Sequence, residues 1–466
     1  MPKKTLNSKS KPTLASLGQV LFTVLTTSLA FSYILSFLLG SYFQISLTES
    51  LIFNVNDGWC DPAKQGIGAH CFGDFHSWMQ SSLSNPWKES ITGYPPLSVI
   101  FFKLMQGLYV LSNSSHLALF VYLFTLSICI SFPIIHLFAT KRIESLRACL
   151  IMGLVLFTLA PTLMVIDRGN NIGFAVPLVY LCFMYALNNQ DKAFLVSVTI
   201  LCLWKPQLGV LSLYFIYRGK NKWFLSWLIV VILGYLASFS FFGLGNVFNN
   251  AKHFFNNLVG YQGYTAIPGY FPSNWSFANF LSVLLDFPRL LSSFPSLDLE
   301  SKTNLLRLPL TYVSITFLIF SLVIIKLKAN RLDKIEVLTL LCLLSILTPS
   351  VTFSYYLSIL IPLVVLICYG ILAESQTSKS NFLSEQEAIK NFILVILRTK
   401  SQRIIFTGVI STCFVSWPIT WKLLGAATTS PARNIGVVWT IGLMMIHVWY
   451  FSILFRKTRK RTRELQ

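Results

Sequence analysis

The sequence predicts an all-α membrane protein that crosses the bilayer many times. The chain of 466 residues is 54% hydrophobic and 12% charged, with a mean hydropathy of +0.64. Apolar runs of about 17 to 25 residues recur from end to end, and each is long enough to cross a bilayer core as a helix. We therefore expect a polytopic helical bundle of about 10–13 membrane segments with a large first outer loop.

The expected membrane segments follow from the apolar runs. The first run, residues 17–42, is longer than the core of a signal peptide, so we interpret it as a retained span. The others cover 116–139, 148–166, 172–188, 223–243, 306–327, 335–349, 354–373, 404–423 and 435–455. Two shorter runs, 193–204 and 208–217, predict a hairpin of short helices with Lys205 near its tip. Residues 95–111 predict a helix that dips into the membrane or lies on its outer face.

The basic residues set the expected orientation. The net charge of +20 comes from 37 Lys and Arg residues against 17 Asp and Glu residues, and they gather in short loops and tails. Positively charged loops stay on the cytoplasmic side of a membrane. Both termini are therefore predicted to be cytoplasmic in a plasma or inner membrane, with the clusters at 141–147, 218–222 and 326–334. This pattern argues against nucleic-acid binding.

The same orientation divides the chain into three parts. We expect a transmembrane module over 1–373, a cytoplasmic loop over 374–403, and a C-terminal transmembrane pair with a basic tail over 404–466. The module contains a first outer loop at 43–93 and an aromatic outer loop at 244–305. The unusual polar segments all fall on the outer side, opposite the orientation charges, and this sorting predicts a functional site there.

The cysteines give little support for a metal site. Seven of the nine lie in apolar segments and are interpreted as small buried side chains. Cys60 and Cys71 share the first outer loop, where a disulfide in an oxidising compartment and two separate thiols are both open. Because the sequence has no CxxC or HExxH pattern, we expect neither a zinc site nor a cofactor.

The first outer loop carries Asp74 just before an aromatic stretch, FHSWMQSSLSNPW. Trp favours the membrane interface, so the stretch is expected to lie along the bilayer surface as a helix that begins near Asp74. One interpretation is that Asp74 caps this helix. The other is that it acts as a general base beside a lipid-borne substrate. The carboxylates that compete for this role are Asp57, Asp61 and Glu89.

Two cations stand out among the apolar segments. The short segment DRGNN places Asp167, Arg168, Asn170 and Asn171 between two long apolar runs. A salt-bridged turn is one interpretation, but the planar fork of an arginine also suits a phosphate. Lys205 lies at or below membrane depth, where an ionisable group marks a functional site unless it snorkels to the surface. Together, Arg168 and Lys205 are suited to neutralise a lipid phosphate.

Aromatic and amide side chains recur in two further outer segments. Residues 260–285 include Asn274 and Trp275, and the segment TPSVTFSYY includes Tyr355 and Tyr356. Such side chains suit sugar rings and their hydroxyl groups, although an interfacial aromatic belt is the simpler alternative. Tyr94 precedes two prolines that restrict the backbone, so a rigid turn and a binding role are both open.

In this order the elements resemble the polytopic glycosyltransferases of the GT-C fold. They are an acidic residue in an outer loop, YPPL, an RGN loop, Lys-Pro after a short apolar helix, an Asn-rich aromatic loop, and S-x-x-x-S-Y-Y before an apolar span. The resemblance covers roughly Gly73 to Leu363 and is closest to glycosyltransferase family eighty-seven, the polyprenol-phosphate-mannose-dependent α-mannosyltransferases. DRGNN and YPPL also resemble segments in the catalytic subunit of the first GPI mannosyltransferase.

The sequence also departs from that family. It has R-G-N where the family more often has G-Q-x-N, Tyr355 and Tyr356 where the family often has two His, and no D-x-D in the first loop. The last departure gives a metal little support.

The resemblance implies transfer of a hexose, expected to be mannose, from a polyprenyl-phosphate donor to a glycolipid or glycan acceptor at the outer face. By analogy, Asp74 would deprotonate the acceptor hydroxyl, which attacks the anomeric carbon with inversion. The implied donor-binding residues are Tyr94, Asp167, Arg168, Asn170, Asn171, Lys205 and Gln207, and the implied acceptor or sugar contacts are His76, Asn274, Trp275, Tyr355 and Tyr356.

Two other functions remain open at this point. A flippase or transporter of lipid-linked sugars would need Arg168 and Lys205 but no base. An accessory subunit of an envelope-glycan assembly complex would use the outer loops to bind protein.

Overall fold

The structure is a computed structural model that describes residues 72–80, 86–89, 93–140, 142–143, 145–265, 275–281, 284, 299–329, 332–349, 352, 354–377, 404–405, 407–409 and 431–455. Within these ranges every regular element is an α-helix or a 3-10 helix and no strand occurs, which confirms the all-α prediction. The predicted span 17–42, most of the predicted span 404–423, and the predictions for Asp57, Asp61, Cys60 and Cys71 lie outside the described residues.

The helices follow most of the predicted apolar segments. The α-helices are α3 (Gly73–Gln80), α4 (Pro86–Glu89), α5 (Pro96–Ser112), α6 (Ser115–Ala139), α7 (Leu146–Thr158), α8 (Ala160–Arg168), α9 (Val176–Leu187), α10 (Asp191–Trp204), α11 (Leu213–Tyr217), α12 (Asn221–Ser240), α13 (Val247–Thr265), α15 (Leu299–Leu327), α16 (Lys334–Leu347), α17 (Ile361–Thr377) and α21 (Pro431–Leu454). Short 3-10 helices, η2 (Asn171–Ala175), η3 (Pro206–Ser212), η4 (Leu244–Asn246) and η5 (Ser354–Leu360), lead into α9, α11, α13 and α17. The predicted hairpin around Lys205 is therefore present.

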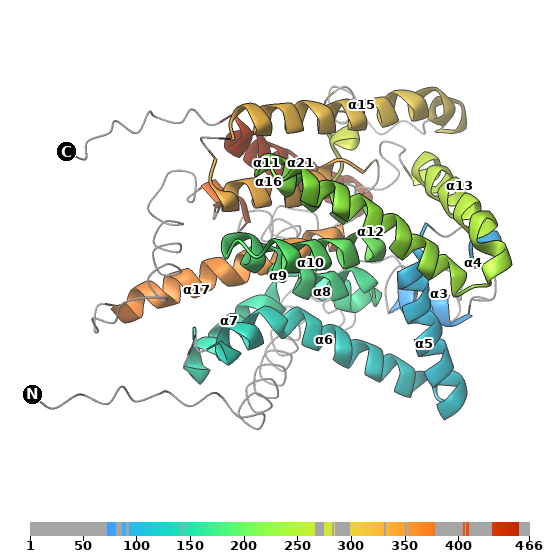
Figure 1. Cartoon of the computed structure of the whole chain (residues 1–466), viewed down its shortest axis with the longest axis horizontal. Coiled ribbons are helices and arrows are strands. Elements are labelled where there is room, and N and C mark those ends of the chain that lie inside the picture. Colours follow the sequence, from blue (N-terminus) through green and yellow to red (C-terminus); the bar gives the residue numbers. More distant parts are fainter. Residues whose placement is uncertain are drawn as a thin grey trace, which may run out of the picture.

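Four helices pack in series across the fold. α6 contacts α9, α9 contacts α10, and α10 contacts α12, so the four lie in that order across the fold (Figure 1). Glycine permits the close approach of α10 and α12, because a Cβ added at Gly234 would meet Leu203 Cδ1 at 2.7 Å. α3, α4, α5 and α13 gather beyond one end of this stack, at the right of Figure 1.

The span predicted over 148–166 is wrong as a single helix. The chain forms α7 and α8 instead, and Leu159 between them has an extended backbone (φ −68°, ψ 132°). Pro161 explains the break, because proline has no backbone N–H and its ring clashes with the preceding turn of a continuing helix. α8 is therefore a separate helix that leads to Arg168.

The predicted outer loop at 244–305 also contains more helix than expected. α13 occupies residues 247–265, and α15 already begins at Leu299. In α13, Val247, Ala251, Phe254 and Leu258 recur every three or four residues, which is the spacing of an amphipathic helix. The sequence prediction missed α13 because this helix has only one apolar face and so forms no long, uniformly apolar run.

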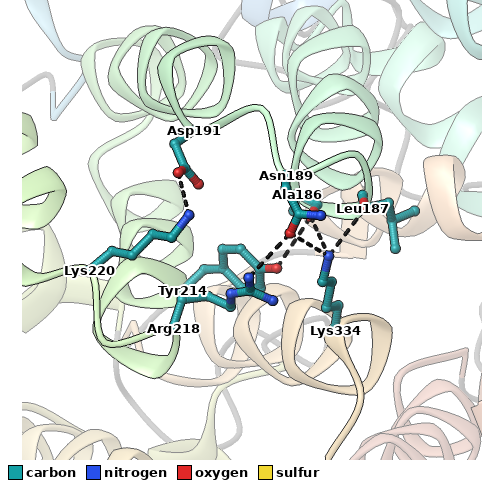
Figure 2. Close-up of polar contacts among 8 residues, drawn as sticks. All are labelled: Ala186, Leu187, Asn189, Asp191, Tyr214, Arg218, Lys220 and Lys334. Carbon is teal, nitrogen blue, oxygen red and sulfur yellow. Dashed lines mark hydrogen bonds and ion pairs between the residues drawn. The ribbon is translucent and has the colours of Figure 1, made fainter.

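A cluster of polar contacts fixes the turn between α9 and α10, and we call it the polar clamp (Figure 2). Lys334, at the start of α16, donates to the carbonyls of Ala186 and Leu187 at 3.3 and 3.2 Å and to Asn189 Oδ1 at 2.8 Å. The carbonyls at a helix C-terminus lack partners within the helix and carry partial negative charge, so a lysine suits them. The clamp is completed by Arg218, which also donates to Asn189 Oδ1, and by the ion pair of Lys220 with Asp191.

Two described helices, α6 and α12, are long and apolar enough to cross a membrane. Further apolar helices within the described ranges have 10–17 residues. Repeated crossing of a bilayer therefore remains a prediction from the sequence.

Candidate functional site

Several of the side chains singled out in the sequence meet in a closed ring of contacts. The ring joins Asp74 of α3, Tyr94 before α5, Arg168 and Asn170 at the end of α8, Lys205 between α10 and η3, and Tyr355 and Tyr356 of η5. We call these seven residues the polar ring. Arg168 lies 94 positions after Asp74 in the chain, so tertiary folding assembles the ring.

Asp74 lies in the first turn of α3, and its two oxygens contact the last residue of α8, Arg168, and Asn170 just after that helix. Arg168 Nη2 lies 3.2 Å from Oδ1, and the Asn170 amide donates to Oδ2 at 2.5 Å. The interpretation of DRGNN as a locally salt-bridged turn therefore misses the partner of Arg168. Asp74 forms an ion pair with Arg168 of a different helix. An aspartate that only caps its own helix would not need such a partner.

Gly169 lets α3 approach α8 this closely. The residue has a φ of +60°, and a Cβ added to it would lie 3.1 Å from Phe75 Cβ. This left-handed conformation is typical of a glycine that ends a helix. Here it turns the chain between Arg168 and Asn170, so that both side chains reach Asp74.

The Asn170 amide is oriented by its own backbone. Its Oδ1 accepts a hydrogen bond from Ile172 N at 2.9 Å, as an N-cap of η2. Its Nδ2 is therefore directed to the other side, where it donates to Asp74 and to the hydroxyl of Tyr94, at 3.2 Å. Asn170 is fully buried, so these bonds are shielded from water.

Lys205 joins the ring through aromatic faces. Its Nζ lies 3.8 Å from the centre of the Tyr94 ring and 5.7 Å from that of Tyr356, and the residue is only 5% exposed. Cation–π attraction is strongest when the cation is desolvated. Burial lowers the pKa of Lys205 to about 7, although the charge of Asp74 opposes this shift.

Arg168 remains charged in the same surroundings. Burial alone would lower its pKa, but the charge and hydrogen bond of Asp74, together with Tyr355 and Tyr94, raise the pKa overall. Its guanidinium carbon lies 4.7 Å from the centre of the Tyr355 ring, and Tyr355 stacks on Tyr356 at 5.1 Å. The two tyrosines therefore connect the two cations, which an aromatic belt at a membrane surface would not require.

Three further residues, not among the predicted site residues, form hydrogen bonds with the backbone next to the polar ring. The Tyr122 hydroxyl donates to the Gly169 carbonyl at 2.8 Å, and Trp204 Nε1 donates to the Asn171 carbonyl at 2.8 Å. Ser98 Oγ in turn donates to the Trp204 carbonyl at 2.7 Å. Only the position of Trp204 next to Lys205 hinted at such a role, since Tyr122 and Ser98 lie in segments that were predicted as apolar helices without a site residue of their own.

The remaining predicted site residues lie around the ring or outside the described side chains. Asn171 is fully buried, and within the described part of the chain its side-chain nitrogen and oxygen have no hydrogen-bond partner. Trp275 is buried and its backbone N–H donates to the Thr352 carbonyl, close in sequence to Tyr355. His76 and Gln207 are half-buried and are not members of the ring. Asn274 and the side chains of Asp167 and Glu89 lie outside what is described.

The polar ring combines one carboxylate with two cations, and tyrosine rings pack against both cations. A carboxylate can accept a proton, and an arginine and a lysine can share the charge of an anion. Among the described residues, no group of three His, Cys, Asp or Glu side chains is arranged to hold a metal ion. No family model, curated protein or solved structure matches this chain.

Proposed function

We propose that the protein is a membrane glycosyltransferase that moves a hexose, expected to be mannose, from a polyprenyl phosphate to a glycolipid or glycan acceptor. The observation that carries the proposal is the polar ring, where Asp74, Arg168 and Lys205 meet although they come from separate parts of the chain. Asp74 is the general base, and Arg168 and Lys205 bind the phosphate of the donor and then of the leaving group.

The electrostatics of the ring support an anionic substrate. Two cations face one carboxylate, and both cations are largely withdrawn from water, where an ionic attraction is stronger. Fixed charges aimed at a leaving phosphate can supply a large part of the rate enhancement. A soluble nucleotide sugar is not required, because a lipid carries the donor phosphate into the membrane.

Outward-facing apolar side chains support a membrane location. On α12, Leu225, Ile229, Ile232 and Leu233 are each 58–59% exposed. Contact between such an apolar surface and water is unfavourable, and lipid chains would replace that water. The ring and the polar clamp lie at opposite ends of α10, so the charges of the proposed site are separated from the basic clusters that set the orientation.

Replacing Asp74 with Asn tests the proposal. The amide keeps the size of the side chain but cannot take a proton, so we expect the transfer of labelled sugar from a polyprenyl-phosphate donor to a membrane acceptor extract to slow by about a hundredfold or more. Asp191→Asn is the matched control, because Asp191 also forms an ion pair but lies at the far end of α10. It should keep most of the activity.

The same assay separates the other functions. Donor sugar that crosses a reconstituted vesicle without reaching a new product would favour a flippase. Equal activity of the Asp74→Asn and Asp191→Asn proteins would remove Asp74 as the base.

A further inference from the structure

Asp74 is held by two partners, one on each carboxylate oxygen. The Asn170 amide lies 2.5 Å from Oδ2, whereas Arg168 Nη2 lies 3.2 Å from Oδ1. A charge-assisted hydrogen bond of this type is usually about 2.7–2.9 Å long, so the arginine contact is loose. Arg168 therefore occupies Oδ1 of Asp74, the oxygen that an acceptor hydroxyl would have to reach.

Arg168 is built to exchange this carboxylate for a phosphate. Its guanidinium carbon lies 4.7 Å from the centre of the Tyr355 ring, so an aromatic face supports the plane of the group. An arginine can bind a phosphate through two parallel hydrogen bonds, which are shorter and stronger than a contact of 3.2 Å. Lys205 contacts the rings of Tyr94 and Tyr356 and adds a second positive charge that would attract the phosphate.

We propose that Arg168 changes partner during the reaction, and that Asn170 is the positioning residue that keeps Asp74 in place when it does. With the site empty, Arg168 pairs with Asp74. When the donor phosphate arrives, Arg168 turns to it and Asp74 Oδ1 becomes available to the acceptor hydroxyl. The inference rests on the proposed function and adds an order to it, with the donor binding before the base becomes active.

In the transfer step, the polar ring accepts both the proton of the acceptor and the charge of the leaving phosphate. The acceptor hydroxyl gives its proton to Asp74, and its oxygen forms a bond to the anomeric carbon. The bond from that carbon to the phosphate oxygen breaks, and the electron pair leaves with the phosphate, which Arg168 and Lys205 hold. Without donor, the pairing of Arg168 with Asp74 protects against deprotonation of other hydroxyl groups.

Asn170 can hold Asp74 without help from Arg168. Its Oδ1 is committed to Ile172 N, which fixes the direction of its Nδ2. That nitrogen bridges Asp74 and Tyr94 from a fully buried position. Asp74 therefore keeps its contact on Oδ2 while Oδ1 changes partner.

The labelling rate of Asp74 tests the exchange. Carboxylates add to an isoxazolium salt to form enol esters, and mass spectrometry of peptides reports each labelled site, with polyprenyl monophosphate in detergent as the probe ligand. Asp191 is the internal control, because its ion pair with Lys220 is of similar exposure, with the two carboxylate side chains 17% and 23% exposed. We expect the lipid phosphate to accelerate the labelling of Asp74 several-fold and to leave Asp191 unchanged. The Arg168→Gln protein should show fast labelling of Asp74 without any ligand.

Binding of the lipid phosphate is followed separately by native mass spectrometry, so the two proposals can fail separately. If the lipid phosphate binds and the labelling of Asp74 stays the same or slows, the partner exchange is wrong and the proposed function stands. If the lipid phosphate does not bind, both are overturned.

Asn170→Asp tests the positioning role. Asp caps a helix about as well as Asn, so the bond from Ile172 N is kept and only the donor to Asp74 is lost. Two adjacent carboxylates disfavour the second ionisation. We expect at least tenfold slower transfer and an acidic limb of the pH–rate profile that moves to higher pH. A residue that merely caps η2 would give wild-type rates and an unmoved profile, and that result would overturn the assignment.

Discussion

Lys205 is a buried cation whose described contacts are aromatic rings. Within the described part of the chain, its ammonium contacts aromatic faces, and the nearest carboxylate of the ring, Asp74, is committed to Arg168 and Asn170. The protein therefore stabilises this charge less than water does. A donor phosphate would provide the missing partner, and its binding should be linked to the proton on Lys205.

This linkage predicts a pH dependence of donor binding. Burial lowers the pKa of Lys205 to about 7, so the empty site is charged below pH 7 and loses the proton as the pH rises. Above pH 7 the donor must bind together with a proton, so its affinity should fall by up to about tenfold per pH unit. The dissociation constant of labelled donor between pH 6 and 9 measures this effect. Lys205→Arg should remove the dependence, because a guanidinium stays charged; the same slope in that variant would contradict the prediction.

Single residues also mark the limit of what the sequence predicts. Arg168, Lys205 and the two tyrosines were found because they interrupt apolar runs or cluster at the end of one. The partner of Arg168 was not found, because an ion pair between residues 94 positions apart leaves no local pattern. The direction of the Asn170 amide depends on its bond with Ile172 N, which the residue order alone does not reveal.

Between elements, the contact of α3 with α8 decides whether Asp74 meets Arg168. Proline ends the preceding helix at Leu159, and Gly169 ends α8 where α3 approaches it. The sequence predicted most helices, because their apolar runs are long. It missed the break at Leu159 and the amphipathic helix α13, because a broken run and a helix with one apolar face both depart from a uniform apolar pattern.

Replacing Gly169 with Ala tests this contact. A left-handed backbone costs a residue with a Cβ about 1–2 kcal/mol, and here the Cβ would also crowd Phe75. We expect a loss of stability of about that size together with a loss of sugar transfer, because α3 must move away from α8. Gly219→Ala is the matched control: Gly219 has a φ of +69° but nothing within 4 Å of the added Cβ. In thermal unfolding, the Gly219→Ala protein should show a similar loss of stability. It should nevertheless keep its sugar-transfer activity. Equal activities of the two variants would show that the approach of α3 is unimportant.

Across the whole molecule, the two ends of α10 should face opposite sides of the membrane. We predict that a cysteine at the exposed position 88, in α4, reacts with an impermeant thiol reagent in intact cells, when Cys60 and Cys71 have been replaced by Ser. A cysteine at the exposed position 188, beside the polar clamp, should react only after the membrane is opened. The reason is the distribution of Lys and Arg. Labelling of position 188 in intact cells would reverse the orientation.

The length of α10 has a consequence for the lipid. A helix rises about 1.5 Å per residue, so Asp191 and Lys205, which bracket this helix, are separated by about 21 Å. If the polar clamp marks the cytoplasmic boundary, Lys205 stops about 10 Å short of the far boundary of a 30 Å hydrocarbon core. The phosphate of a polyprenyl donor, which normally rests at headgroup level, must then sink toward the ring, or the bilayer must thin locally to meet it. The protein would shape its surrounding membrane as part of receiving its substrate.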